Sequence, residues 1–467
     1  MAISKNAMIA IIVVAAIAVA AIAFVAFSNG GGSDEGGNGA RVGEVIEEKD
    51  FPNSESRLWV YGNANEDDYM NEDDLTALKA MVSGSAKHSQ LADANADGTI
   101  DSNDVDYLKK ILDAKESTKL DVYYIDNYFT VAKVSWPVKS FATSYCSGLY
   151  TAEATGLTQK MTMVDQTISD YWASLNSYAE KATVFGETEG PNYDLMMKNK
   201  IDVYVPGYCD AKADPLSKEK LNPVGIDVMF MNTCDNSGVD YPNEYIDRSI
   251  LMFGYLLQGD VEQCYLYLAW HDKIKDAVTS AASTLDESEK GALIMSRSAP
   301  TYSESPFSLT GKGNTNMIHA DWAGCYVVAD HSSWLNKNYQ DVRTEDILKI
   351  LRETAESGHQ TVYWIDNEHD GLRHQKDRDL DETLPAWAKE LSVAVSDNYY
   401  LGMAREAGNS PLYVIEMVFY MNVMHPGLID LKFDEEFNYF IENFTLETNK
   451  YTSKMDIDDF FKEFGFL

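Results

Sequence analysis

The sequence predicts two α/β lobes joined by one long helix, preceded by a small all-α module and an apolar N-terminal segment. Three observations support this architecture. Short β-rich runs alternate with helical stretches from about residue 116 to the end. A helical pattern without internal glycine or proline, Asp260–Leu285, separates two such series. Two acidic loops of similar spacing lie near the start of the chain, each followed by an amphipathic stretch.

The chain begins with a segment that predicts membrane attachment. Residues 8–27 form an uncharged apolar run, long enough to cross about 30 Å of hydrocarbon as a helix. Lys5 precedes this run and favours a cytoplasmic N-terminus. We therefore expect residues 1–27 to be a transmembrane anchor, with a cleaved signal segment as the alternative. Residues 28–56 are rich in glycine, serine and acidic residues, which predicts a flexible linker.

The second acidic loop has the ligand spacing of a calcium-binding loop. Such a loop places side-chain oxygens at positions 1, 3, 5 and 12 and a backbone carbonyl at position 7. Gly98 at position 6 permits the sharp turn. The expected ligands are Asp93, Asn95, Asp97, the carbonyl of Thr99, and Asp104.

The first acidic loop has the same spacing with two departures. Asp68 replaces the glycine at position 6, and Asn63 replaces the aspartate at position 1. The expected ligands are Asn63, Asn65, Asp67, the carbonyl of Tyr69, and Asp74. The sequence thus predicts two Ca²⁺ sites; the alternative is an acidic surface without metal.

The duplicated loops differ from an EF-hand, which closes with glutamate and has a helix on both sides. Both loops here end in aspartate, and only the following helix is evident. Apolar residues at helical spacing follow each loop: Leu75, Leu78, Met81 and Val82, then Val105, Leu108, Ile111 and Leu112. The pattern over residues 57–114 resembles a type I dockerin. This resemblance implies a calcium-folded docking module with a cohesin-type protein as its partner.

The amino-acid composition limits the classes of partner that the chain can bind. The 467 residues carry a formal net charge of −36, which argues against nucleic acid or anionic lipid as a partner. The hydrophobic share of 45% is ample for a large core. Five widely spaced cysteines show no metal-binding or redox pair and are expected to be buried thiols, although one or two disulfides remain an alternative.

The C-terminal module is expected over residues 116–467. We place lobe one at 116–258, the linking helix at 259–285 and lobe two at 286–467. The candidate strands are Val122–Ile125, Ser140–Thr143, Ile201–Val205 and Val228–Met231 in lobe one, and Ala292–Ser296 and Thr361–Ile365 in lobe two. A helix over Asp165–Lys181 is expected in lobe one.

This module resembles the solute-binding proteins of ABC importers that carry iron-siderophore, haem or cobalamin. The segments that carry the resemblance follow the family's order: Trp136-Pro-Val-Lys139-Ser-Phe, Thr155-Gly-Leu157 leading to Met163-Val-Asp165, Lys200-Ile-Asp202-Val-Tyr-Val, Leu221-Asn-Pro-Val-Gly225-Ile-Asp-Val, Val342–Leu348, and Asn409-Ser-Pro411 through His425-Pro426. The resemblance implies a ligand site between two lobes, an ABC permease as partner and an extracytoplasmic location.

The candidate ligand residues lie in loops after the expected strands. They are Tyr145 and Tyr208 from lobe one, and Arg297, Tyr302 and His369 from lobe two. Aromatic faces and a guanidinium suit a bulky anionic metal chelate. The alternatives are core or surface positions for the tyrosines and a surface ion pair for Arg297. Direct metal coordination by His319, His331 and His369 is a further alternative, although nothing in the sequence brings them together.

We therefore expect an extracytoplasmic receptor that binds a metal complex for ABC import and carries a calcium-dependent docking module. Catalysis is not expected, because the chain has no nucleophile elbow, zincin motif or phosphate loop. The main alternative is a surface scaffold or adhesion protein whose dockerin-like module binds a cohesin-type partner. A dockerin-borne enzyme of a polysaccharide complex is a third possibility.

Overall fold

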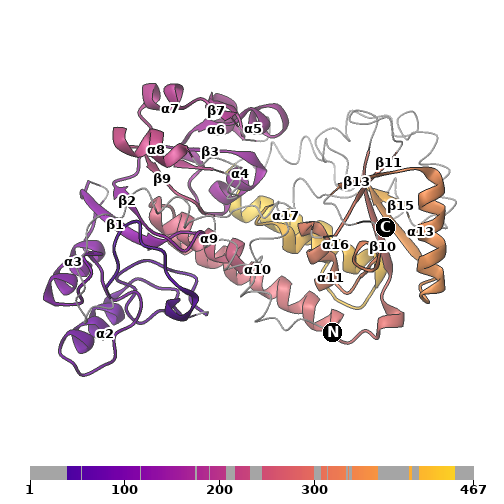
Figure 1. Cartoon of the computed structure of the whole chain (residues 1–467), viewed down its shortest axis with the longest axis horizontal. Helices are drawn as coiled ribbons and strands as arrows, with labels where there is room; N and C mark the ends of the chain where they lie inside the picture. The colour runs from indigo at the N-terminus through magenta and orange to yellow at the C-terminus, as the bar shows by residue number, and fades with distance from the viewer. Residues whose placement is uncertain are drawn as a thin grey trace. The chain divides into compact units, whose positions relative to one another are not determined.

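The computed structural model describes residues 39–446 except 54, 116, 174–175, 189, 207–215, 232–243, 299–306, 313, 333–334, 336–338, 367–398 and 402–409. The chain forms two compact units (Figure 1). The first runs to Lys139 and includes residues 202–204 and 221–231; the second holds 140–201, 205–220 and the residues from 232 onward. The first unit therefore extends past residue 114, where the sequence analysis ended the calcium module.

The first unit is built around two helices that each follow an acidic loop. Its elements are η1 (Glu48–Asp50), α2 (Glu72–Val82), α3 (Ser102–Leu112), β1 (Leu120–Ile125), β2 (Val131–Trp136), η4 (Asn222–Val224) and β9 (Asp227–Val228), with most of β8 (Val203–Val205). Leu75, Leu78 and Met81 of α2 share one apolar core with Val105 and Leu108 of α3. The helical spacing predicted for both stretches is confirmed.

A two-stranded hairpin belongs to this unit. Strands β1 and β2 pair antiparallel, from Leu120 opposite Trp136 to Ile125 opposite Val131. The prediction that Val122–Ile125 is a strand is confirmed, but its assignment to lobe one is wrong. The reason is local pairing, because the turn over residues 126–130 brings the next β-rich run back beside it.

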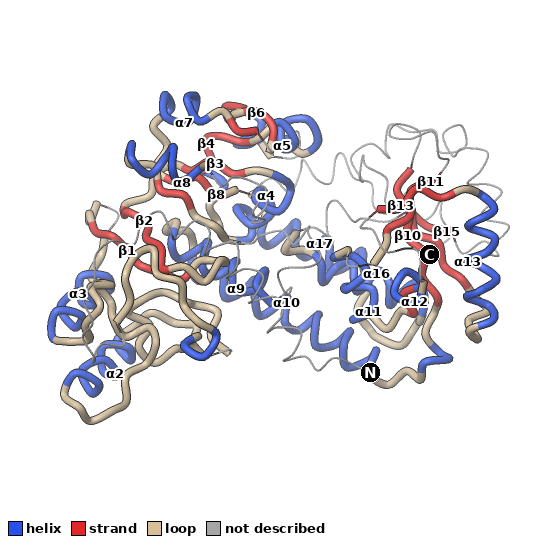
Figure 2. Tube along the Cα trace, in the orientation of Figure 1, coloured by secondary structure: helices blue, strands red, loops and turns tan. Residues whose placement is uncertain are grey.

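The expected flexible linker is wrong for residues 39–53. These residues run as loops and turns, drawn in tan in Figure 2, and include the short helix η1. Their backbone pairs with the hairpin, where Gly43 N–H donates to the Val131 carbonyl at 2.8 Å and Ile46 N–H to the Phe129 carbonyl at 2.8 Å. Phe51 stacks on Phe129 with ring centroids 4.4 Å apart. A few apolar residues and backbone pairing order this part of the expected linker, which lies after its glycine-rich run.

The second unit has two α/β halves. The first half contains β3 (Phe141–Thr143), α4 (Tyr145–Ala154), η2 (Thr158–Lys160), β4 (Met161–Val164), α5 (Gln166–Tyr171), α6 (Ser177–Lys181), β5 (Thr183–Val184), β6 (Gly186–Glu187), β7 (Gly190–Pro191), α7 (Tyr193–Asn199), α8 (Ser217–Leu221) and α9 (Glu244–Leu256). Strands β3, β4 and β5 are parallel. The single helix expected over Asp165–Lys181 is wrong, because Asn176 caps a new helix and accepts from the Tyr178 and Ala179 N–H groups.

The long connecting helix predicted over Asp260–Leu285 is confirmed as α10 (Val261–Ala282), 22 residues capped by the Asp260 carboxylate. It leads from the first half of the unit to the second (Figure 1). Near the C-terminus of the described chain, α17 (Phe433–Phe444) packs on it, and Trp270 Nε1–H donates to Glu436 at 2.7 Å. Tyr150 of α4 also contacts Phe440 of α17, edge to face.

The second half holds a mixed sheet with the order β13-β11-β10-β14-β15, and β12 pairs with the start of β10. Its elements are η5 (Glu287–Glu289), β10 (Ala292–Ser298), β11 (Phe307–Thr310), α11 (Thr315–Trp322), β12 (Tyr326–Val327), α12 (Val328–His331), β13 (Tyr339–Val342), α13 (Thr344–Glu356), β14 (Val362–Asp366), β15 (Tyr399–Leu401) and α16 (Tyr413–Met424). Both strands predicted here are confirmed as β10 and β14. Figure 1 shows α13 on one side of the sheet and α11 and α16 on the other.

The predicted strands Ser140–Thr143 and Ile201–Val205 are also present, as β3 and β8, whereas the run Val228–Met231 is a strand only at its start, in β9. Cys146, Cys264 and Cys325 are buried free thiols. Among the helices within the described residues, none combines the length and the apolar character needed to cross a bilayer. The anchor predicted over residues 1–27 lies outside the described residues.

Candidate functional site

The predicted ligand residue Tyr145 lies at the end of β3, where the chain enters α4. Its backbone has φ of +65°, a left-handed conformation that is costly for a residue with a side chain and is concentrated at functional sites. The ring is buried and packs edge to face on Trp172, with centroids 5.9 Å apart. Tyr145 is thus a fixed part of the strand end, and its ring is largely covered by protein.

Asp165 follows the neighbouring strand β4 and holds this turn in place. Its carboxylate accepts from the Tyr145 N–H at 3.2 Å, from the Ile168 N–H at 2.8 Å and from the Thr188 hydroxyl. Burial raises the pKa of Asp165 to about 6, and these hydrogen bonds limit the rise. The C-terminal ends of two adjacent parallel strands therefore converge, which is where open α/β sheets bind ligands.

Gly148 allows α4 to start this close to the strand. A Cβ on Gly148 would lie 2.2 Å from Oγ1 of Thr143, the last residue of β3. The hydroxyls of Thr143 and Ser147 are buried with no hydrogen-bond partner among the described residues. They leave unused polar atoms beside the Tyr145 turn.

The other predicted ligand residues are not brought together by the described structure. Arg297 lies in β10, where it pairs with Ser308 of β11, but only its backbone is described. Tyr208, Tyr302 and His369 lie outside the described residues. A site that combines Tyr145 with these four residues stays a prediction.

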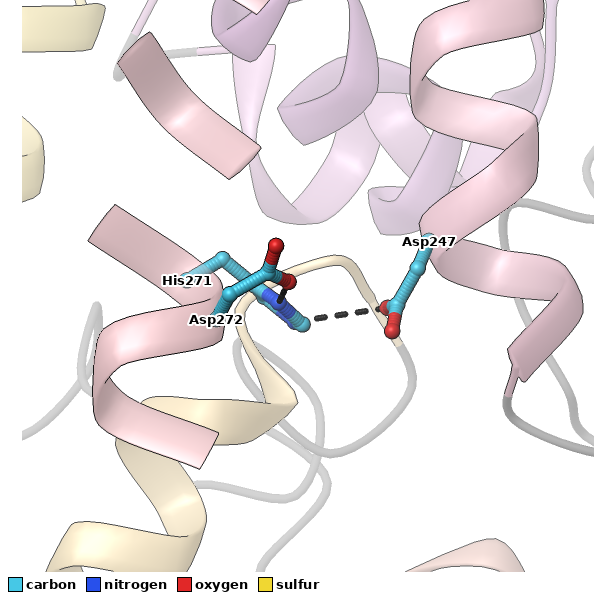
Figure 3. Close-up of side chains that lie close together, drawn as sticks. All are labelled: Asp247, His271 and Asp272. Atoms are coloured by element: carbon cyan, nitrogen blue, oxygen red, sulfur yellow. Dashed lines mark hydrogen bonds and ion pairs between the residues drawn. The ribbon is translucent and has the colours of Figure 1, made fainter. Parts of the chain in front are cut away.

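A buried polar cluster that the sequence analysis missed links α9, α10 and α16. Figure 3 shows the His271 imidazole between the carboxylates of Asp247 and Asp272, at 3.4 and 3.5 Å. Lys275 Nζ lies 3.0 Å from Asp247 Oδ2. Tyr413 of α16 donates its hydroxyl to both oxygens of Asp247, at 3.0 and 3.2 Å. The sequence did offer one indication of this cluster. His271 lies on the apolar face of the predicted helix, four residues before Lys275.

This cluster does not suit a metal ion. The ligand atoms of Asp247, His271 and Asp272 lie within 4.8 Å of one another. Both oxygens of Asp247 already accept from Lys275 or Tyr413, however, and the Lys275 ammonium would repel a divalent cation. The arrangement is a buried ion pair with hydrogen bonds, and its evident effect is to hold three helices together.

The surroundings of His319 do not indicate metal coordination either. Its Nδ1 lies 3.4 Å from Oε2 of Glu416, and its ring stacks on Tyr413 with centroids 4.5 Å apart. Burial lowers the pKa of His319, while Glu416 opposes the change. His331 instead stacks on Tyr326, with ring centroids 4.2 Å apart. Each of these two histidines is therefore engaged with its own local partners.

The second acidic loop is folded as a compact turn around its first residue. Asp93 is fully buried, and its Oδ2 accepts from the Gly98 N–H at 2.9 Å while Oδ1 accepts from the Asp97 N–H at 3.2 Å. Asp104 accepts from the Asn95 and Asp101 N–H groups. Gly98 has φ of +92°, as the sharp turn at position 6 requires.

The first acidic loop differs at the two positions where its sequence departs. Asp68 at position 6 pairs with Arg57, whose Nη2 lies 2.7 Å from Oδ2. The Asn63 amide nitrogen donates to the carbonyls of Leu58 and Asp67, at 2.7 and 2.6 Å. Its Oδ1 is buried with no hydrogen-bond partner in the described structure, so it is available to a ligand.

The donor sets of both loops fit a hard cation. Burial raises the pKa of Asp104 to about 6, with the Asp93 carboxylate adding to the effect, and burial raises the pKa of Asp74 to about 6. Buried carboxylates that lie beside one another need a compensating charge. Carboxylate, amide and carbonyl oxygens are the ligands that Ca²⁺ takes. Asp93, Asn95, Asp97, Asp104 and the Thr99 carbonyl would hold it in the second loop.

No protein-family model and no curated protein matches the sequence. Solved structures match through their fold. A TroA-like periplasmic binding protein, FepB, from Veillonella parvula gives a TM-score of 0.56 at 13% identity, over 69% of this chain and 96% of that one. MolA from Haemophilus influenzae, bound to molybdate, gives a TM-score of 0.53 at 13% identity, over 69% of this chain and 97% of MolA. A periplasmic solute-binding protein from Veillonella parvula gives a TM-score of 0.53 at 13% identity, over 72% of this chain and 97% of that protein. The chain therefore has the fold of the TroA-like periplasmic binding proteins.

Proposed function

We propose that this protein is an extracytoplasmic solute receptor that captures a metal complex, such as a ferric siderophore, haem or a corrinoid, for an ABC permease. The observation that carries the proposal is the pair of α/β halves joined by the single helix α10. The same fold forms the TroA-like binding proteins above. The turn at Tyr145 places an aromatic residue at a strand end, where such a fold binds its ligand.

The ligand class rests on chemistry rather than on likeness to any one neighbour. A bulky chelate needs aromatic surface and few polar contacts. The described structure places Tyr145 at the first strand ends, with its ring mostly covered by protein. The aromatic surface for a chelate would therefore come mainly from the predicted residues Tyr208 and Tyr302, and the positive charge from Arg297. MolA, with the same fold, binds the small oxyanion molybdate. An oxyanion is therefore the second ligand class to test.

Binding is tested by titrating the full chain with ferric siderophores, haem, cobalamin and molybdate while following tryptophan fluorescence. Trp364, buried on β14, donates to the Ser296 hydroxyl at 2.8 Å, and Trp322 ends α11. Both report on the second half. Saturable binding at micromolar concentration or below would establish a receptor and name its solute class. The absence of binding across the panel would overturn the proposal.

We further propose that the two acidic loops bind Ca²⁺ and that the metal stabilises the first unit. The buried carboxylates of Asp93, Asp104 and Asp74 and the unused amide oxygen of Asn63 support this. A small core of this size gains much of its stability from metal. Calorimetric titration of chelator-treated protein should show two binding events. No heat beyond dilution would refute the calcium sites while leaving the receptor proposal intact.

The alternative is a surface scaffold whose dockerin-like module recruits a cohesin-type protein, with residues 1–27 as the membrane anchor. One observation bears on the docking surface, because Tyr107 of α3 donates its hydroxyl to the Asp121 carbonyl of the hairpin at 2.8 Å. Part of the surface of α3 is thus covered by the hairpin and is not free to contact a cohesin-type protein. Calcium-dependent capture of a purified cohesin domain, without solute binding, would favour the scaffold.

A further inference from the structure

Residues 39–51, here called the N-terminal strap, cover the second acidic loop. The Ala40 N–H donates to Asp93 Oδ2 at 2.7 Å, the same oxygen that accepts from Gly98. Ala40 and Asp93 are both buried. A segment more than fifty residues away in sequence therefore supplies a hydrogen bond to the first ligand position of the loop.

Strap and loop approach each other backbone to backbone. A Cβ on Gly39 would lie 1.9 Å from the carbonyl carbon of Gly98, and a Cβ on Gly98 would lie 2.7 Å from Nε of Arg41. Arg41 also forms an antiparallel bridge with Asp97. The close approach requires glycine at position 39, and Gly98 is required for its left-handed turn.

The other end of the strap lies on the hairpin. Gly43 N–H donates to the Val131 carbonyl, and the Val131 N–H donates to the Glu44 carbonyl, both at 2.8 Å. Phe51 then packs against Phe129 and Trp59, with ring centroids 4.4 and 5.5 Å apart. The strap therefore ties the second loop to the β1–β2 hairpin.

We propose that calcium binding in the second loop and closure of the strap are coupled, so that each favours the other. This inference rests on the proposed calcium sites. Bound calcium would fix the direction of the Asp93 carboxylate and the turn at Gly98, which are the two features that the strap contacts. A closed strap keeps the same features in place before the ion arrives. Thermodynamic linkage then requires equal coupling in both directions.

The coupling has a consequence for the reach of the chain. When the strap is released, residues 39–51 become an extension of the segment that precedes the first unit. At ~3.3 Å per residue an extended strap spans roughly 40 Å. Calcium would thus set how far the first unit extends from whatever holds the N-terminus.

The test measures both directions on the full chain. Hydrogen exchange of residues 43–46 is followed with calcium and after chelation, and calcium affinity is measured by calorimetry. Ala40→Pro removes the N–H that donates to Asp93 and leaves the sequence of the loop unchanged. Losing a hydrogen bond to a charged acceptor should lower the affinity of one of the two sites roughly tenfold. Phe51→Ala, at the far end of the strap, should lower the affinity of the same site. Val42→Ala, an exposed change within the strap, is the control and should leave affinity unchanged.

Faster exchange of residues 43–46 after chelation, together with weaker calcium binding in both variants, supports the coupling. Calcium binding that is unaffected by Ala40→Pro and Phe51→Ala, with equal exchange in both conditions, overturns the coupling alone. If the unmodified chain binds no calcium, both this inference and the proposed calcium sites fail.

Discussion

The hydroxyl of Tyr413 donates hydrogen bonds to both carboxylate oxygens of Asp247, at 3.0 and 3.2 Å, and so joins α16 to α9 across 166 residues of sequence. The same carboxylate pairs with His271 and Lys275 of α10. The consecutive helices α9 and α10 and the distant helix α16 thus share one buried anion. Its removal would leave the Lys275 ammonium without a counter-charge at this position.

We therefore expect Asp247→Asn to lower the free energy of unfolding by about 3 kcal/mol, because removing one partner of a buried pair leaves the other uncompensated. Asp272→Asn is a matched control, since it makes the same chemical change beside the same histidine on a side chain 41% exposed. Asp272→Asn should lower the free energy of unfolding by less than about 1 kcal/mol. Urea denaturation of both variants measures the difference, and equal losses would show that burial of Asp247 is not decisive.

His319 predicts a pH-dependent loss of stability. Burial lowers its pKa in the folded protein, while the unfolded chain has the ordinary value of about 6.5. Below that pH the unfolded state takes up a proton first, so stability falls as pH decreases. His319→Gln removes this proton uptake.

Wild type should therefore lose more stability than His319→Gln between pH 7 and pH 5, with a slope of at most ~1.4 kcal/mol per pH unit. Urea denaturation at both pH values gives the comparison. The exposed His88→Gln should follow wild type. If the free energy of unfolding falls equally in wild type and in His319→Gln, the lowered pKa of His319 is not the cause of the pH dependence.

Much of the architecture follows from periodicity, because the long helix and the buried strands have strong local patterns. Helical spacing without an internal glycine or proline predicted α10, with the apolar positions Val261, Tyr265, Leu268, Ile274 and Val278. The same pattern places His271 on the buried face, but its partner Asp247 lies on another helix, and no local rule pairs the two. Residues 39–53 were mispredicted for a related reason. Their many charged residues, following a glycine-rich run, indicate flexibility, whereas their fold depends on Val131, Phe129 and Asp93 far along the chain.

The candidate ligand site was the least predictable part. Sequence order placed Tyr145 after a strand, and the structure confirms that position. Its left-handed backbone and its hydrogen bond to Asp165 arise from packing of α4 against β3 and β4. Such strain leaves no pattern in composition, because it is imposed by neighbouring elements.

Gly148 gives a direct test of that packing. In a helix, Gly→Ala normally stabilises by up to about 1 kcal/mol. Here the new Cβ would lie 2.2 Å from Thr143 Oγ1, so Gly148→Ala should instead destabilise by roughly 1–3 kcal/mol. Gly190→Ala is the control, because a Cβ there meets nothing within 4 Å.

Adding Thr143→Ala to Gly148→Ala should recover much of the lost stability, since the clashing hydroxyl and methyl are removed together. Thermal denaturation of the single and double variants measures this. If the two changes are simply additive, the clash with Thr143 is not the cause.

The two acidic loops should differ in calcium affinity, and the carboxylate at position 12 of each should control its own site. In the second loop Gly98 has the left-handed turn and Asp93 supplies a buried charged ligand. In the first loop position 1 is the neutral Asn63, and Asp68 is held by Arg57 at 2.7 Å. Fewer charged ligands lower the affinity of a calcium loop. We expect the second loop to bind more tightly.

Asp104→Ala should then abolish the tighter of two calcium-binding steps, and Asp74→Ala the weaker. Both side chains are fully buried and also accept from the backbone N–H of the helix N-cap, at 2.8 Å in each loop. Asp106→Ala is the control, because this carboxylate lies on the exposed side of α3 and pairs with Lys109. Calorimetric titration separates the steps. Loss of the tighter step in Asp74→Ala would reverse the order of the sites, because the glycine turn and the charged first ligand would then not determine affinity.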